Sequence, residues 1–367
     1  MNEEELLHEV DDRLLVLTQK LHLLKYLTPT NIATEREHFV AMKGNYDPRF
    51  SYHFPPAEEI NAWVEALHDM KTVYFDGQIY ENIISKLLLD KIEENIVIAK
   101  LLLAYSEQDF VNIEKYNTIL YGTFNPELLK QAEDILQSYK EPNPELRGTI
   151  LTGDEIQQYI LTYMQKHNIT DVKITPNTSS AAKFIISFGK NICYLSYSPQ
   201  MKIREYILEA DLIHELQTHY TRYAHGKKTG WNIFTFGTQN YLTDEEGLAL
   251  YNVCAYYKTF YPAFQKIGIY QKYLLLQQSQ GISFREVATY IQDKKWSKNL
   301  SNIFTMILRC KQGIQDTSVK NQGNIFLKNK LYVDGYHHVS QRVAQGNDVN
   351  SLLQAKVKID DLPYFLG

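Results

Sequence analysis

Cysteine is scarce in this chain of 367 residues. The three cysteines, Cys193, Cys254 and Cys310, lie far apart in the sequence and form no C-x-x-C pair. Their number and spacing fit neither a disulfide framework nor a metal knuckle built from paired cysteines. We therefore expect reduced thiols in the core of a cytoplasmic protein.

Long apolar runs are missing as well. The most apolar stretch, from Ile96 to Leu103, is interrupted by Lys100 and is far shorter than the roughly 20 residues that cross a bilayer as a helix. The first residues, MNEEELLHEVDD, are acidic, whereas a secretion signal begins with positive charge followed by an apolar stretch. We expect neither a transmembrane helix nor a secretory signal, and no membrane partner.

The chain also has no excess of positive charge. Lys and Arg together number 38 and Asp and Glu 43, so the formal net charge is −5. A surface that follows nucleic-acid phosphates needs a net positive charge, so we expect no nucleic-acid partner. Hydrophobic residues make up 44% of the chain and charged residues 22%, which is typical of a folded globular protein.

Helical patterns dominate the N-terminal part of the chain. Near the start, apolar residues recur at spacings of four and three, which predicts one apolar face of a helix: Leu6, Val10, Leu14, Leu17 and Leu21. The segment from Ile79 to Tyr105 is apolar nearly all round, so we predict a buried central helix there. Asn125-Pro126 supplies a cap and a first-turn proline for a further helix, through Leu136.

A linker is predicted at Glu141-Pro142-Asn143-Pro144. Two prolines with polar neighbours cannot continue a helix and favour extended backbone. The length of the chain suggests about two domains. We predict an N-terminal helical region over residues 1–142 and a second domain over residues 143–367.

The pattern changes after this linker. Thr152 and Glu155 have the spacing of a capping box, which predicts a helix to about His167. Gly189-Lys190-Asn191 predicts a hairpin turn, and a helix is expected from about Ile203 to Tyr220. Three short β-rich runs lie between the two helices: Val172–Thr175, Phe184–Phe188 and Ile192–Tyr197. The predicted fold is α+β and mostly helical, with a small sheet beside the second helix.

The sequence His214-Glu215-Leu216-Gln217-Thr218-His219 carries the clearest chemical signal. It resembles the zincin signature, in which two histidines on one helix bind Zn²⁺ and the glutamate after the first histidine activates water. In that signature the histidines are four residues apart and lie about 40° apart around the helix, whereas a spacing of five places them about 140° apart. A π-bulge absorbs one extra residue, so we predict one near Leu216 to Thr218.

A hydrolytic zinc site usually has three protein ligands, and two residues compete for the third place. His225 lies six residues after His219, but Arg222 occupies the place where a glycine would turn the chain. Glu246 is the other candidate and would lie on a second helix, although Thr243 and Glu246 also have the spacing of a capping box.

The motif resembles the QEGLA-motif family of zinc metallopeptidases, which includes the microtubule-associated tyrosine carboxypeptidases. The likeness rests on the HExxTH sequence followed by Tyr220, Arg222 and Gly226, and on Glu246-Gly247-Leu248-Ala249. Weaker elements extend it over most of the chain: Pro29-Thr30-Asn31, Leu120-Tyr121-Gly122, Phe326-Leu327-Lys328 and Asp361-Leu362-Pro363. Glu245 stands where the family name has Gln, and Gln217 where a Gly is expected.

This resemblance implies a zincin-like metallopeptidase with one Zn²⁺ per chain. His214, His219 and Glu246 would be the ligands, and Glu215 the general base. The implied reaction is that of a carboxypeptidase, which removes a C-terminal residue such as tyrosine or another aromatic from a peptide or protein tail.

Two questions stay open at the level of the sequence. Arg222 is the nearest cation that could bind the terminal carboxylate of a substrate, but it could equally be a structural ion-pair partner. The whole site could also belong to a non-catalytic metal-binding regulatory or scaffold protein.

Overall fold

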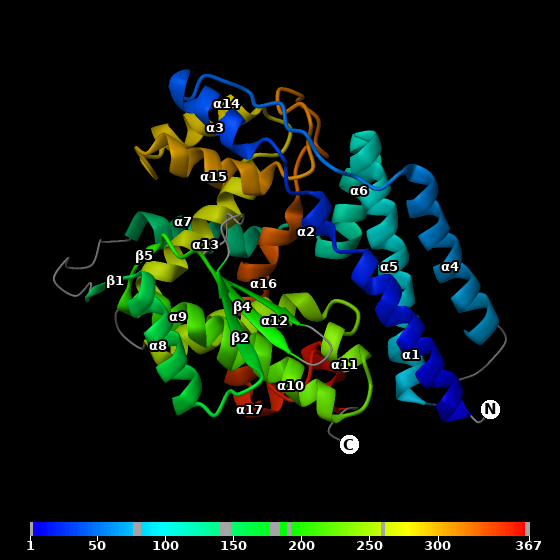
Figure 1. The fold of residues 1–367 in the computed structure, drawn as a ribbon. Coiled ribbons are helices and arrows are strands. Elements are labelled where there is room, and N and C mark those ends of the chain that lie inside the picture. Colours follow the sequence, from blue (N-terminus) through cyan, green and yellow to red (C-terminus); the bar gives the residue numbers. More distant parts are fainter. Residues whose placement is uncertain are drawn as a thin grey trace. The chain divides into compact units, whose positions relative to one another are not determined.

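The computed structural model describes residues 3–75, 82–138, 148–176, 184–188, 192–257 and 261–363, without the side chains of residues 261–267. These residues form many helices and two small sheets, which confirms the mostly helical α+β class (Figure 1). The predicted linker at 141–144 and the predicted turn at 189–191 lie outside the described residues. Among the described residues, no helix has both the length and the apolar character needed to span a bilayer.

The chain divides into two compact units. The first contains Met1–Ser138, Thr238–Asn240 and Ile267–Asp334, and the second contains Tyr139–Gly237, Tyr241–Lys266 and Gly335–Gly367. The segment Ile267–Asp334, which the sequence placed in the domain of residues 143–367, thus lies with the N-terminal helices. It does so because its helices share a phenylalanine-rich core with helix α3.

The first unit contains three long helices, coloured blue to cyan in Figure 1: α1 (Glu3–Lys20), α4 (Ala57–Phe75) and α5 (Ile83–Glu107). They pack against one another. Val10 and Leu14 of the predicted apolar stripe are fully buried. Helix α5 buries residues along its whole length, as its apolar composition predicts.

The remaining helices of this unit surround two more cores. One core joins α3 (Ile32–Ala41), α14 (Phe284–Asp293) and α15 (Leu300–Cys310) through Phe39, Phe284 and Phe304. Ser283 forms a capping box at the start of α14. The other elements are α2 (Leu23–Tyr26), α6 (Phe110–Tyr121), α7 (Pro126–Ser138), η3 (Leu327–Lys330) and most of α13 (Tyr261–Gln278).

A three-stranded sheet forms the β part of the second unit. Its order is β2 (Val172–Pro176), β4 (Cys193–Tyr197), β3 (Phe184–Phe188), so the three predicted strands are confirmed. Strand β3 runs antiparallel to β4 with Phe184 opposite Tyr197, and β2 runs parallel to β4. Strand β3 is at one edge of the sheet and packs against the segment that carries the histidine motif.

The core of the second unit lies between this sheet and its helices. Leu195 of β4 is fully buried against Ile156 and Ile160 of α8 (Gly153–Lys166), and Thr152 forms the predicted capping box of that helix. Leu212 of α9 (Glu205–Leu212) and Leu216 complete this core. The apolar face of the motif segment is therefore fixed against the sheet.

The predicted helix from Ile203 to Tyr220 begins and ends differently in the structure. Ile203 lies in strand β5 (Lys202–Arg204), which pairs with β1 (Ile150–Thr152), and the helix starts only at Glu205. Pairing with a distant strand outweighed the local helical pattern here. Beyond the motif, helical structure continues in α10 (Thr221–Lys228).

Further helical elements complete the second unit. They are α11 (Ile233–Phe236), α12 (Tyr241–Tyr256), α17 (Val349–Leu352) and η4 (Ile359–Asp361), together with most of α16 (Leu331–Ala344). Among them, α12 makes the most extensive contact with the motif.

Candidate metal centre

The motif segment Ile213–Tyr220, labelled η2, is a π-helix inserted between α9 and α10. This confirms the predicted distortion, which extends over the whole motif. Two threonine hydroxyls donate to carbonyl oxygens five residues back, Thr218 to Ile213 at 3.3 Å and Thr221 to Leu216 at 3.2 Å. Threonines thus stabilise the wider turn in a segment that has no glycine.

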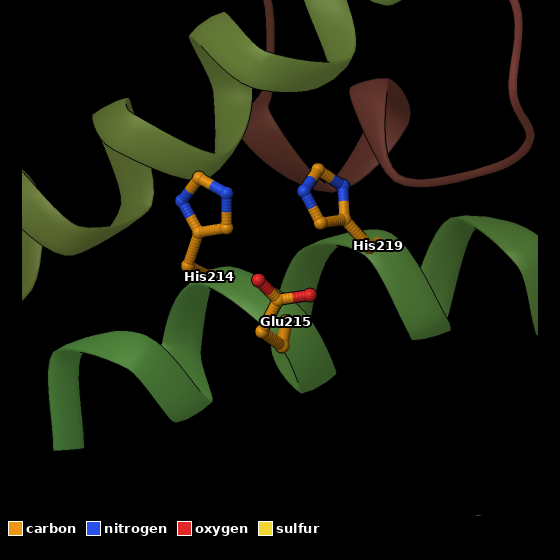
Figure 2. A group of neighbouring side chains, drawn as sticks. All are labelled: His214, Glu215 and His219. Atoms are coloured by element: carbon orange, nitrogen blue, oxygen red, sulfur yellow. The ribbon is translucent and has the colours of Figure 1, made fainter. Parts of the chain in front are cut away.

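The π-helical turn brings His214 and His219 to the same side of the segment. Their ring centroids are 4.7 Å apart and the ring planes are nearly perpendicular. Figure 2 shows both imidazoles rising from one side of the segment, with the Glu215 carboxylate between them. Nitrogen and oxygen atoms of the three side chains lie within 4.8 Å of one another, so they could share one cation.

Glu246 joins this group from helix α12. Its Oε2 atom lies 3.4 Å from His214 Nε2 and 3.8 Å from His219 Nε2, and its side chain is 8% exposed. Thr243 is the third residue of α12, so it is not the N-cap that the capping-box interpretation requires. The two imidazoles therefore face a buried carboxylate from a second helix.

His225, the other candidate for the third ligand, has a different partner. Its Nδ1 atom lies 3.0 Å from the carbonyl oxygen of Leu353. The structure brings Glu246, and not His225, together with the histidine pair.

These donors fit a zinc ion. Tetrahedral Zn²⁺ with bonds of about 2.0–2.1 Å separates its ligand atoms by about 3.4 Å, close to the 3.4 and 3.8 Å observed here. Two imidazoles and one carboxylate are also a frequent ligand set of hydrolytic zinc sites, in which the fourth position stays open.

The electrostatics of the group favour positive charge. Burial lowers the pKa of His214, but its hydrogen bond with Glu246 and the charges of Glu215, Glu246 and Asp211 outweigh this effect and raise the pKa to about 9. A cation at this position would replace a proton that the surrounding carboxylates already favour.

Glu245 occupies a different position from its neighbour Glu246. Its Oε1 atom is 2.8 Å from His219 Nδ1, on the side of the ring away from Glu246. Burial raises the pKa of Glu245, but the charges of Lys356 and Arg222 and the contact with His219 outweigh it, and the pKa lies far below its usual range. Of the two adjacent carboxylates, Glu246 faces both histidine Nε2 atoms and Glu245 lies behind one ring.

Arg222 does not have the free guanidinium that a substrate-binding role requires. The residue is 1% exposed. Its nitrogens donate to the carbonyl oxygens of Ala355 and Val357 and to the Glu245 carboxylate. The expectation that Arg222 binds a substrate carboxylate is therefore corrected, and the alternative of a structural ion-pair partner describes its contacts.

Several residues beside the centre gave no usable signal in the sequence. Lys356, from the C-terminal part of the chain, lies 3.3 Å from Glu245. Asn252 of α12 donates to Thr218 Oγ1 at 2.9 Å and so links this helix to the π-helix. Asp244 accepts the backbone N–H of Ile359 at 2.7 Å, and its other oxygen lies 2.6 Å from His338 Nδ1. His338 is therefore paired with a buried aspartate.

The site combines a helix-borne histidine pair, a glutamate between them and a glutamate from a second helix. Comparison with known proteins agrees with the resemblance seen in the motif. Residues 37–366 match the family model described as microtubule-associated tyrosine carboxypeptidase, and the chain belongs to this family.

Individual relatives are distant. Microtubule-associated tyrosine carboxypeptidase 1 of Mus musculus is 24% identical over 327 residues, which are 85% of this chain and 55% of that protein. The protein of the same name from Rattus norvegicus is 24% identical over 328 residues, and that from Homo sapiens 23% over 323. The chain thus spans about half the length of the curated relatives it matches.

Proposed function

We propose that this chain is a zinc-dependent carboxypeptidase with a zincin-like site. His214, His219 and Glu246 would hold one Zn²⁺, and Glu215 would act as general base. The observation that carries this proposal is the approach of His214 Nε2 and His219 Nε2 to the same carboxylate oxygen of Glu246.

Bound zinc would supply a Lewis acid that polarises a peptide carbonyl and lowers the pKa of water from 15.7 toward roughly 7. The chain's own residues would do the rest. Glu215 lies within 4.8 Å of the histidine ligand atoms, close enough to hydrogen-bond a water molecule attacking at this centre. It would take a proton from that water and pass it to the nitrogen of the departing residue.

Strand β3 offers a place for the substrate backbone. It is an edge strand and packs against the π-helix that carries the histidines. An extended peptide could add to this edge as a further strand, with backbone hydrogen bonds holding its last residues near the centre.

The proposed substrate is the C-terminal tail of a peptide or protein. The relatives are named as tyrosine carboxypeptidases, so tyrosine or another aromatic is the proposed terminal residue. Arg222 is excluded as the carboxylate-binding cation by its buried contacts, and another group would have to recognise the terminus.

The first test measures zinc per chain and then hydrolysis. We expect about one zinc per chain, and loss of a single C-terminal residue from peptides with a free terminus, detected by product mass. Chelation should stop this reaction, and C-terminal amidation should slow it strongly. Zinc binding without hydrolysis of any tail would instead favour a non-catalytic metal-binding regulatory protein.

Glu215→Gln tests the general base separately. The amide cannot accept the proton, so we expect zinc content to stay at the wild-type level while turnover falls by about 10²- to 10⁴-fold. Unchanged turnover in this variant would refute the role of Glu215.

A further inference from the structure

Glu245 is surrounded by hydrogen-bond donors on both of its oxygens. Oε1 lies 2.8 Å from His219 Nδ1 and 3.3 Å from Lys356 Nζ, and Oε2 accepts a hydrogen bond from Arg222 Nη1. The side chains of Glu245, Arg222 and Lys356 are 3%, 1% and 6% exposed. Solvent can therefore contribute little to satisfying these charges, and they depend on one another.

Both cations are tied to the C-terminal segment Ala355–Val357. Lys356 belongs to it, and Arg222 donates to the carbonyl oxygens of its first and last residues. The Lys356 ammonium also lies 4.0 Å from the ring centroid of Phe188, and its backbone N–H donates to the carbonyl of Phe234. The segment is thus held close beside the metal centre from several directions.

We propose that Glu245 is a positioning residue for His219, and that Arg222 and Lys356 make the affinity for zinc depend on the C-terminal segment Ala355–Val357. This inference rests on the proposed zinc site. A carboxylate can only accept hydrogen bonds, so it selects the His219 tautomer with the proton on Nδ1. Nε2, the nitrogen near Glu246, then keeps its lone pair for a metal ion.

A glutamine at position 245 would not serve the same purpose in this chain. Its amide has one accepting oxygen and one donating nitrogen, and Arg222 and Lys356 have only donors. One position of the side chain faces both His219 and Lys356, and the other faces Arg222. An amide oxygen in the first position leaves the NH₂ group against the Arg222 guanidinium, which is also a donor. An amide oxygen in the second position leaves the NH₂ group against Lys356 and His219 Nδ1, which favours the His219 tautomer with the proton on Nε2 and takes that nitrogen away from a metal ion.

Two variants test this inference by zinc affinity, measured in competition with a chromophoric chelator. Glu245→Gln leaves only one accepting oxygen for the donors of His219, Lys356 and Arg222, and Lys356→Met removes one cation that holds Glu245 in place. We expect each to weaken zinc binding by roughly 10- to 100-fold, the usual effect of losing a residue that orients a metal ligand. The visible spectrum of the Co²⁺-loaded variants should also change, because the orientation of His219 changes.

Lys311→Met is the matched control. Lys311 is another fully buried lysine, but among the described residues its ammonium donates to the carbonyls of Ser279 and Ile282 in the first unit. Its replacement should leave zinc affinity unchanged. Melting of the metal-free proteins shows whether each variant folds.

The outcomes separate this inference from the proposed function. If the wild-type protein binds zinc and both test variants bind it equally well with unchanged Co²⁺ spectra, Glu245 does not position His219. The inference also fails if Lys311→Met weakens zinc binding as much as Lys356→Met. If the wild-type protein takes up no zinc at all, the proposed function itself fails, and this inference with it.

Discussion

Gly247 of α12 and Gly335 of α16 meet so closely that neither position has room for a side chain. A Cβ atom on Gly247 would lie 2.2 Å from the carbonyl carbon of Gly335, and one on Gly335 would lie 1.9 Å from the carbonyl oxygen of Thr243. The obstructing atoms are backbone atoms, which cannot rotate away. Gly247 directly follows Glu246 in the sequence, so this helix contact also positions the proposed third ligand.

Gly247→Ala should therefore destabilise the protein and disturb the centre. Overpacking a rigid contact costs about 1–3 kcal/mol, and sometimes more. Urea unfolding measures this loss. Gly268→Ala is the matched control, because a Cβ atom on Gly268 of α13 meets no atom of the described residues within 4 Å and alanine is the better helix former by about 1 kcal/mol. Equal stability of Gly247→Ala and the wild-type protein would contradict the contact.

Thr218→Val should loosen the π-helix. The replacement keeps the shape of the side chain but removes the hydroxyl, which donates to Ile213 O and accepts from Asn252. Thr218 is fully buried, so an unsatisfied partner costs about 1–3 kcal/mol, and zinc affinity should fall as well. Thr162→Val removes a similar hydroxyl bond from an exposed site in the regular helix α8, and it should affect neither quantity.

Lys311 should make stability depend on pH above neutrality. Burial lowers its pKa from 10.5 to about 7 in the folded protein. Between these two values the unfolded chain binds the proton and the folded protein does not, so the free energy of unfolding rises with pH in this window, by up to about 1.4 kcal/mol per pH unit. Unfolding of the wild-type protein and of Lys311→Met at pH 7, 8 and 9 measures the difference. If the difference in the free energy of unfolding between the two proteins does not change with pH, the lowered pKa of Lys311 is disproved.

Zinc removal should lower the melting temperature. An ion that binds only the folded state stabilises it by about 2.7 kcal/mol when its free concentration is 100 times the dissociation constant. We expect chelation to lower the melting temperature and added zinc to restore it. His219→Gln removes one proposed ligand. Chelation and added zinc should therefore change the melting temperature of this variant less than that of the wild-type protein. Identical responses of the two proteins would place the zinc elsewhere.

Much of the local structure could be predicted from the sequence. The capping box at Thr152, the three strands of the larger sheet and the distortion of the motif segment all appear in the structure. Each depends on residues a few positions apart, whose spacing is read directly. The spacing of His214 and His219 was the strongest of these signals, because a regular helix could not bring both rings to one side.

Contacts between distant residues could not be predicted in this way. Ile203 follows a helical pattern, but it pairs with Leu151 in a sheet. Arg222 looked available to a substrate, and only the fold showed it buried against Ala355 and Val357. Nothing in the sequence near Lys356 pointed to Glu245.

The sequence by itself determined which donor atoms the motif offers, because His214, Glu215 and His219 and their spacing are properties of one short segment. Only the tertiary structure decided which carboxylate faces the histidines and which supports one of them from behind. Glu245 and Glu246 are adjacent and chemically identical. They differ because successive helical residues point about 100° apart. Glu246 points toward the Nε2 atoms of both histidines, and Glu245 points toward His219 Nδ1 and two buried cations.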